Sequence, residues 1–337
     1  MTSKTTGKND QIPLNSRKLH AHQFGVVCEY DTPASSKIGK LKHKCMMTDM
    51  TVYTDETIPI DIFKTDQTLN KLVGYVTDYK HEYLMDQGKI FINGKWIYSC
   101  DITNLKVVYM YLIGLRRDQI LNVYTTVLYN VEENRIEVYT DSGRLIRPLF
   151  IVDSGNKLRI TQDIIDGLES GKYDWDYLMS KGIVEYVHGH EAHNSYIIAK
   201  DEYTLISDDP ELINYTHCEI PLGSISMNVL NQPFNDHNQG PRKTYQCSMG
   251  KQAIGRYVSN DYWRMDTEGN VLAGPQIPLV TCITDEYTGL TRMPAGENPI
   301  VAILCYSGFN IEDSVINNKQ SVENGLFDTY EYKVVNS

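Results

Sequence analysis

The sequence contains no apolar run of about 18 residues, the length at which a helix can cross a bilayer, so we expect no membrane span. Its amino terminus, MTSKTTGKNDQ, has no apolar core, which excludes a secretory signal there. The seven cysteines are scattered and form no CxxC pair. This spacing argues against a zinc ribbon and against a disulfide scaffold, so we expect free thiols in a reducing compartment.

The chain also has no internal repeats and no low-complexity tracts. Its 337 residues allow two or three domains, and a hydrophobic content of 41% with 22% charged residues is typical of a globular protein. The formal net charge of −11 argues against a protein that coats nucleic acid with its whole surface. It leaves room for a local basic strip aimed at phosphates.

The apolar pattern predicts both strands and helices. KIFINGKWIY (Lys89–Tyr98) is typical of a hairpin that turns at an Asn-Gly pair. Leu105–Thr126 is the best helix candidate in the first half, and Val127–Asp153 predicts consecutive strands. Residues 160–182 indicate a helical stretch. NPIVAILCYS (Asn298–Ser307) predicts a strand buried on both faces.

The most informative segment is NDHNQGPRKTYQCSMGKQAIG (Asn235–Gly255). It has neither a helical apolar stripe nor a strict alternation, and so many polar groups are costly to bury without polar partners. Gly250-Lys251 suggests a phosphate-binding P-loop, which needs glycine five residues earlier and serine or threonine after the lysine. Tyr245 and Gln252 occupy those two positions, so a P-loop is excluded.

Basic residues in and next to this segment alternate with tyrosines. Arginine binds phosphate through two parallel hydrogen bonds, and a nearby aromatic ring can stack on a base or a sugar. The pattern therefore fits a nucleotide or nucleic-acid contact, and ordinary internal salt bridges fit it equally well. The residues concerned are Arg242, Lys243, Lys251 and Arg256, with Tyr245 and Tyr257.

Two further groups could carry chemistry. The adjacent carboxylates Glu312 and Asp313, in GFNIEDSVI, could help to hold Mg²⁺ beside a bound triphosphate, or they could lie in a solvated turn. VHGHEAH has histidines spaced H-x-H-x-x-H, which could ligate a transition metal in a tight turn; an exposed, unliganded loop is the commoner case. His20 and His22 could face a partner or serve packing.

Taken in order, these segments resemble the second-largest subunit of multisubunit DNA-directed RNA polymerases of the eukaryotic, archaeal and large-DNA-virus type. The blocks DHNQGPRKTYQCSMGKQ and GFNIEDSVI together are highly specific for that family. RKLHAHQFGVVCEYDTP (Arg17–Pro33) resembles its fork segment, and IEVYTDSGRLIRPLFIVD (Ile136–Asp153) its first external region. LMSKGIVEYV resembles the second external region, and the text from YTHCEIPLGSI (Tyr215–Ile225) onward resembles the opening of the hybrid-binding domain.

The resemblance implies a β-rich α+β fold with a fork segment, two small external modules and part of a barrel-like hybrid-binding domain. The implied boundaries are 1–55 for the fork-like segment, 56–160 for external region 1, 161–210 for external region 2, and 211–337 for the amino-terminal part of the hybrid-binding domain. It further implies that the chain is a middle portion, or one piece of a split gene.

Roles for individual residues also follow from the resemblance. Arg242 matches an arginine that contacts the triphosphate of the incoming nucleotide, and Tyr245 matches a neighbouring aromatic. Lys251 and Gln252 match residues that line the RNA–DNA hybrid. Asp313, with Glu312, matches the acidic pair beside the nucleotide-borne magnesium, so the implied catalytic set is Arg242, Glu312 and Asp313, with Asp313 as the metal ligand.

Two local departures from the family pattern stand out. Where the family continues Thr-Pro with Glu-Gly, this chain has Ala34-Ser35, and where it has Asn-Gln, this chain has Asn318-Lys319. Lys319 adds a cation near the implied path of the hybrid. No zinc site is implied in this chain.

The resulting hypothesis is a part of a DNA-directed RNA polymerase that is inactive alone and contributes nucleotide and hybrid contacts to RNA synthesis. Its implied partners are the largest subunit and other polymerase subunits, chains that supply missing amino- and carboxy-terminal parts, template DNA, the hybrid, nucleoside triphosphates and a Mg²⁺ shared with the largest subunit. It would be intracellular, in nucleus, cytoplasm, viral factory or virion. A truncated non-catalytic scaffold or decoy, and a self-contained hydrolase built on Glu312 and Asp313, are the alternatives.

Overall fold

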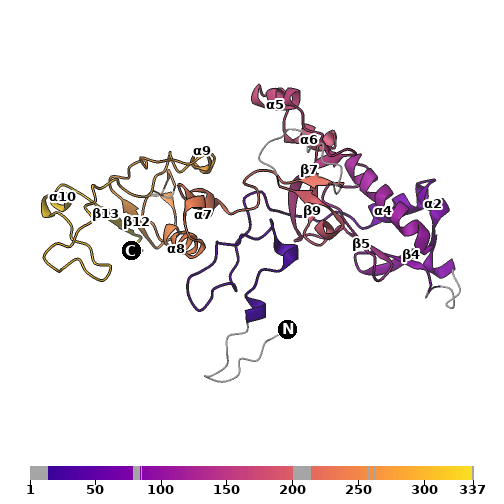
Figure 1. The fold of residues 1–337 in the computed structure, drawn as a ribbon, viewed down its shortest axis with the longest axis horizontal. Coiled ribbons are helices and arrows are strands. Elements are labelled where there is room, and N and C mark those ends of the chain that lie inside the picture. Colours follow the sequence, from indigo (N-terminus) through magenta and orange to yellow (C-terminus); the bar gives the residue numbers. More distant parts are fainter. Residues whose placement is uncertain are drawn as a thin grey trace, which may run out of the picture. The chain divides into compact units, whose positions relative to one another are not determined.

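The computed structural model describes residues 14–78, 84, 86–199, 214–256, 258–260 and 263–335. The chain divides into two compact units (Figure 1). Unit 1 comprises Met1–Arg17, Tyr30–Lys42 and Ser226–Ser337, and unit 2 comprises Lys18–Glu29 and His43–Ile225. Both contain helices and strands, which confirms the α+β class.

The four-part division expected from the sequence stays a prediction, and its boundary at residue 210 lies outside the described residues. Among the described residues, no helix is long and apolar enough to cross a membrane.

Unit 2 contains a five-stranded sheet with the order β2-β4-β3-β6-β5. Only the β3–β6 pair is parallel. The hairpin predicted at residues 89–98 is confirmed as β3 and β4: Asn93 and Gly94 have φ values of 46° and 78°, as a type I′ turn requires. The strands are β2 (Val73–Tyr75), β3 (Gly88–Ile92), β4 (Lys95–Cys100), β5 (Thr126–Asn130) and β6 (Arg135–Tyr139).

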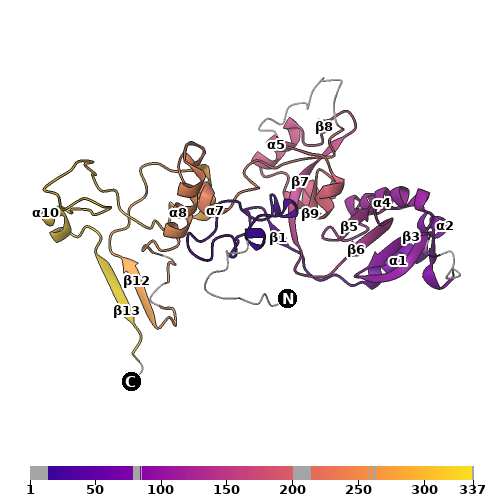
Figure 2. The same cartoon turned by 60° about the horizontal axis from the view of Figure 1, so that its bottom comes forward.

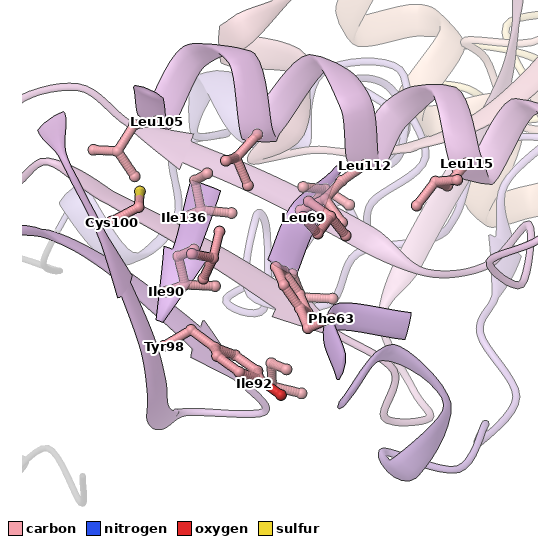
Figure 3. Close-up of a cluster of buried hydrophobic side chains, with 14 of the residues drawn as sticks. Phe63, Leu69, Ile90, Ile92, Tyr98, Cys100, Leu105, Leu112, Leu115 and Ile136 are labelled. Atoms are coloured by element: carbon pink, nitrogen blue, oxygen red, sulfur yellow. The ribbon is translucent and has the colours of Figure 1, made fainter. Parts of the chain in front are cut away.

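Helix α4 (Ile102–Arg117) packs its apolar side against this sheet, together with α1 (Thr57–Thr65) and α2 (Leu69–Leu72) (Figure 3). Leu105 and Leu112 of α4 are at most 1% exposed; Leu105 lies toward Cys100 of β4, and Leu112 lies toward Leu69 of α2. The helix predicted over 105–126 is therefore present, but it ends at Arg117. Gln119 has a φ of 59°, which a right-handed helix cannot continue through, and the chain then enters β5.

A six-stranded sheet is built around β7 (Leu145–Asp153), which confirms the strands predicted over 127–153. The helical stretch predicted over 160–182 forms two helices, α5 (Gln162–Glu169) and α6 (Trp175–Ser180), because the chain turns between them at Gly171, which has a φ of 70°. The other strands are β1 (Asp49–Met50), β8 (Lys157–Leu158), β9 (Val184–His188), β10 (Ile197–Ile198) and β11 (His217–Cys218).

A buried ion cluster joins the elements of unit 2. The Arg116 side chain is 3% exposed, and its Nη2 lies 3.1 Å from Glu185 Oε2 and 2.6 Å from Glu191 Oε1. Glu185 also pairs with Arg117 Nη2 at 2.5 Å and His217 Nε2 at 2.6 Å. Burial raises the pKa of Glu185, but Arg116, His217 and Arg117 outweigh it and hold that pKa well below its usual value. The cluster ties α4 to β9, to β11 and to the 3₁₀ turn Glu191–Asn194.

Two imidazole rings of the VHGHEAH segment pack against that of His22, which also contacts the ring of His20. The His22 ring centroid lies 3.8 Å from that of His193 and 4.3 Å from that of His190, and His20 lies 4.5 Å from His22. Burial, with the charges of His193, His190 and His20, lowers the pKa of His22 to about 4. Burial, with His190 and Arg144, likewise lowers the pKa of His188 to about 4. Both imidazoles are therefore neutral near pH 7.

Unit 1 contains several short helices and one two-stranded sheet, in which β12 pairs with β13 in antiparallel fashion (Figure 2). Its described elements are the 3₁₀ turns Leu14–Ser16 and Asn235–His237, helices α7 (Met227–Leu230), α8 (Gly240–Gly250), α9 (Ile283–Thr288) and α10 (Lys319–Glu323), and strands β12 (Glu268–Leu272) and β13 (Thr329–Lys333).

One segment of this unit had no predicted helix or strand, and one expectation for the unit was wrong. Asn235–Gly255 lacks a helical stripe, yet it contains α8, whose one buried side chain is Cys247; a helix that is exposed on nearly all sides needs no stripe. Asn298–Ser307 forms no strand, and its apolar side chains are exposed. Ile300 and Ile303 are fully exposed, because no other described segment covers them.

Removing core volume from α4 should destabilise unit 2. We expect Leu112→Ala to lower the free energy of unfolding by about 2–5 kcal/mol, the usual cost of a buried leucine truncation. Met110→Ala, on the same helix but 56% exposed, is the matched control and should change the free energy of unfolding by less than about 0.5 kcal/mol. Urea denaturation followed by tryptophan fluorescence measures both; equal effects would show that α4 does not pack as described.

Acid should weaken unit 2 through the histidine cluster. The unfolded chain takes up protons at His22 and His188 near the ordinary pKa of 6.5, whereas the folded chain does so only near 4. The contribution of His22 and His188 to the free energy of unfolding is therefore intact above pH 6.5 and is lost as the pH falls toward 4. We expect a loss of about 1–3 kcal/mol between about pH 7.5 and pH 5, a range that allows for the partial solvation of His22.

This loss is measured by denaturation of the Trp263→Phe variant, in which Trp96 and Trp175, both in unit 2, remain as reporters. Replacing His22 and His188 by glutamine should flatten the pH dependence, whereas the control His237→Gln, at an exposed site in unit 1, should leave it unchanged. A pH profile that is unaffected by the double substitution would contradict this account.

Candidate nucleotide and nucleic-acid site

Helix α8 presents Arg242 and Tyr245 on one exposed side. The helix begins after Gln239, which is extended, and Pro241 in its first turn favours the helical φ. Arg242 and Tyr245 are three residues apart and thus neighbours on the helix surface. The Arg242 guanidinium carbon lies 5.7 Å from the centroid of the Tyr245 ring, and Tyr245 is 44% exposed.

Gln232 fixes α8 against the preceding helix. Its Nε2 donates to the carbonyl oxygen of Asn228 at 3.2 Å, to that of Lys243 at 3.1 Å, and to the Cys247 sulfur at 3.2 Å. Cys247 is 1% exposed, so α8 is anchored on that side while its polar side faces outward.

Lys251, directly after α8, is paired with a buried carboxylate. Its ammonium nitrogen lies 2.7 Å from Asp31 Oδ1, and the Asp31 side chain is 1% exposed. Asp31 Oδ2 also accepts hydrogen bonds from Ser226 Oγ at 3.0 Å and Asn228 Nδ2 at 2.9 Å. The internal salt bridge considered for this basic set is therefore present at Lys251, whose side chain is still 38% exposed.

The remaining members of the basic set, and the predicted nucleic-acid contact Gln252, have separate surroundings. The Lys243 ammonium lies 4.6 Å from the centroid of the Tyr30 ring. Gln252 is exposed, and its backbone N–H donates to the Met249 carbonyl at 2.9 Å. Arg256 lines a cavity of about 250 Å³ beside α9. Tyr257 lies outside the described residues.

The acidic pair lies on a turn near the carboxy-terminal end of unit 1. Glu312 and Asp313 are exposed and have φ values of 59° and 68°, a left-handed conformation that is uncommon for two successive non-glycine residues. Neither forms an ion pair with another described residue. Lys319 begins α10, and its side chain is 89% exposed, 3.6 Å from Glu323.

Of the predicted site residues, the structure places Arg242 beside Tyr245 on α8, and it places Lys251 at the carboxy-terminal end of the same helix. It records no hydrogen bond or ion pair from Arg242 or Tyr245 to the Glu312–Asp313 turn within the described chain. Sequence reasoning missed Asp31, because nothing in the local text shows that it pairs with a lysine 220 positions later.

No group of three or more His, Cys, Asp and Glu side chains among the described residues could hold a metal ion. The Glu312–Asp313 pair alone would supply only part of the six oxygen ligands that Mg²⁺ prefers. Any such ion would take its further ligands from water, a bound nucleotide or another chain.

Comparisons with known proteins agree with the order of these segments. The family described as RNA polymerase Rpb2, domain 6, matches residues 229–337, and Rpb2, domain 4, matches residues 90–153. The chain is 37% identical to the DNA-directed RNA polymerase II subunit RPB2 of Encephalitozoon cuniculi over 94% of its length, which is 27% of that protein. It is also 37% identical to the DNA-directed RNA polymerase II subunit 2 of Arabidopsis thaliana, over 92% of this chain and 26% of that protein.

An archaeal protein is similar to nearly the same extent. The DNA-directed RNA polymerase subunit Rpo2 of Saccharolobus solfataricus is 34% identical over 94% of this chain and 28% of that protein. The chain thus spans roughly a quarter of the length of the curated relatives it matches. The chain belongs to the Rpb2 family, the second-largest subunits of multisubunit DNA-directed RNA polymerases, of which it carries a part that includes domains 4 and 6.

Proposed function

We propose that this chain contributes contacts to the incoming nucleoside triphosphate and to the RNA–DNA hybrid during template-directed RNA synthesis. In this proposal Arg242 and Tyr245 bind the nucleotide, and Lys251, Gln252 and Lys319 contact nucleic acid. The chain acts as a part of a nucleotidyltransferase and is inactive alone. Because template DNA lies inside the cell, the proposal also places the protein there.

The observation that carries the proposal is the exposed pairing of Arg242 with Tyr245 on α8. A guanidinium binds phosphate oxygens through two parallel hydrogen bonds, and the adjacent phenol ring can pack on a sugar or base. Arg242 stands in the first turn of an eleven-residue helix, where the helix dipole also favours a negative group. A phosphate beside Arg242 would therefore meet two favourable charges.

Lys251 would act from a fixed position. Its ammonium is held 2.7 Å from Asp31, and 38% of its side chain is exposed. A phosphate that approached would share the lysine with Asp31. Such a contact positions a nucleic-acid backbone without reading its sequence.

Glu312 and Asp313 would offer carboxylate oxygens to a Mg²⁺ shared with the nucleotide and the largest subunit. A bound magnesium would neutralise phosphate charge during phosphoryl transfer. Their exposure and left-handed backbone support a role toward a group outside the chain, because strained positions persist most often at functional sites.

Exposed apolar side chains around this turn support assembly with other polypeptides. Ile300 and Ile303 are fully exposed, and Phe309 and Val315 are each 80% exposed. Large apolar side chains exposed close together in the sequence favour a role in a protein interface. We propose that other polymerase chains, including those that supply the remaining parts of the subunit, cover these side chains.

Arg242→Ala tests the nucleotide contact. In a polymerase complex that contains this chain, we expect the substitution to raise the KM for nucleotide and to lower kcat/KM by about 100-fold, the usual cost of losing one charge-stabilising donor. Single-nucleotide primer extension at varied nucleotide concentration measures both constants.

The matched control is Arg292→Ala, an exposed arginine of the same unit outside the proposed site, which should leave both constants unchanged. Unchanged kinetics for Arg242→Ala in an active complex would overturn the proposed nucleotide contact. A complex that assembles with this chain but shows no extension, with or without substitutions, would favour the non-catalytic scaffold instead.

A further inference from the structure

A second cavity is lined by residues of unit 2 alone, and none of them belongs to the proposed polymerase site. It has a volume of about 580 Å³ and lies between the segment that follows α4, helix α6 with its N-cap residue, and strand β9. Aromatic and acidic side chains dominate its polar lining. They are Tyr124, Asp174, Trp175, Asp176, Tyr177 and Tyr186.

The aromatic rings of this cavity are held in place by contacts with one another. The Trp175 indole N–H donates to the Tyr186 hydroxyl at 3.2 Å, and the Tyr124 and Tyr186 ring centroids are 5.3 Å apart. Tyr177 is already engaged, since it stacks on Tyr173 at 4.0 Å and Lys181 lies 5.9 Å from its centroid. A ligand would therefore meet Trp175, Tyr124 and Tyr186.

The charge around these rings is negative. Asp174 caps α6 by accepting from the Tyr177 N–H at 2.8 Å, which holds its carboxylate at the rim, and Asp176 is exposed two residues later, in the first turn of α6. Burial raises the pKa of the Tyr186 phenol, and the charges of Asp49 and Asp176 raise it further. No lysine or arginine is among the residues that line the cavity; Lys181, over Tyr177, is a cation beside it.

We propose that this cavity binds an arginine or lysine side chain from a basic segment of a partner protein. Aromatic faces attract a cation, most strongly when it is partly desolvated, and nearby carboxylates add to that attraction. The same carboxylates repel phosphate, which argues against a nucleic-acid ligand here. The Lys181–Tyr177 contact shows the same kind of pairing within the chain, at the edge of the cavity.

The test uses the full chain labelled with ¹⁵N and observes its three tryptophan indole N–H signals by NMR. The probe is the peptide Gly-Arg-Gly with blocked ends, and its control contains citrulline, the uncharged isostere of arginine. We expect the arginine peptide to shift the Trp175 signal selectively, because that N–H donates to Tyr186 within the cavity. The citrulline peptide should produce no shift at equal concentration.

Two variants with a matched control complete the test. Asp176→Asn should weaken binding by about three- to fivefold, as expected for one exposed charge pair. The control is Asp163→Asn, an equally exposed residue in the first turn of α5, which should not weaken binding. Tyr124→Leu should weaken binding by about tenfold through loss of a ring face.

Equal shifts from the arginine and citrulline peptides would overturn the proposal, as would equal effects of the two aspartate substitutions. Tighter binding of a phosphorylated peptide than of the arginine peptide would also overturn it, because it would mean that the cavity prefers anions.

Discussion

The buried carboxylate of Asp31 is the interaction on which unit 1 depends. It accepts hydrogen bonds from Ser226 and Asn228 and pairs with Lys251, so it joins the segment of residues 30–42 to both α7 and α8. A carboxylate buried to this extent is costly unless several donors compensate it, and the described residues supply Ser226, Asn228 and Lys251. Because Lys251 follows α8 directly, the same contact fixes the carboxy-terminal end of the helix that carries Arg242 and Tyr245.

Unit 2 also contains a buried ion cluster, which connects its two sheets. Arg116 is buried between Glu185 and Glu191, and removing either partner would leave charge without compensation. This cluster joins the five-stranded sheet and its helix α4 to the sheet around β7. Unit 2 thus buries its apolar side chains around this cluster, whereas the carboxy-terminal part of unit 1 exposes its own. The contrast fits a stable module beside a segment that other chains complete.

Local sequence patterns predicted the local structure well. The Asn93-Gly94 turn, the strands over 127–153 and the helix that begins before Leu105 follow from turn chemistry and apolar periodicity, which act over a few residues. The extended stretch 298–307 was predicted as a buried strand because its text is apolar, but burial requires a covering partner, and the described chain provides none. Helix α8 was missed for the opposite reason, since it is polar and largely exposed.

The candidate site was predictable only through the family resemblance. Spacing alone excluded a P-loop at Lys251 and left nucleotide binding and internal salt bridges as equal alternatives. The structure records an internal salt bridge from Lys251 to Asp31, and it also pairs Arg242 with Tyr245 on an open surface. The long-range partners, Asp31 for Lys251 and His22 for His190 and His193, depend on how distant segments fold together, which no local pattern encodes.

The central claim is that this chain forms one wall of an active centre that other chains complete. The most direct measurement is photo-crosslinking from a modified nucleotide at the growing end of the RNA, in a complex assembled with this chain, followed by mapping of the attached peptide. The account predicts attachment within Gly240–Gln252 and no primer extension by the chain alone. Extension by the isolated chain, or an active complex whose crosslinks all fall outside this segment and the Glu312–Asp313 turn, would contradict it.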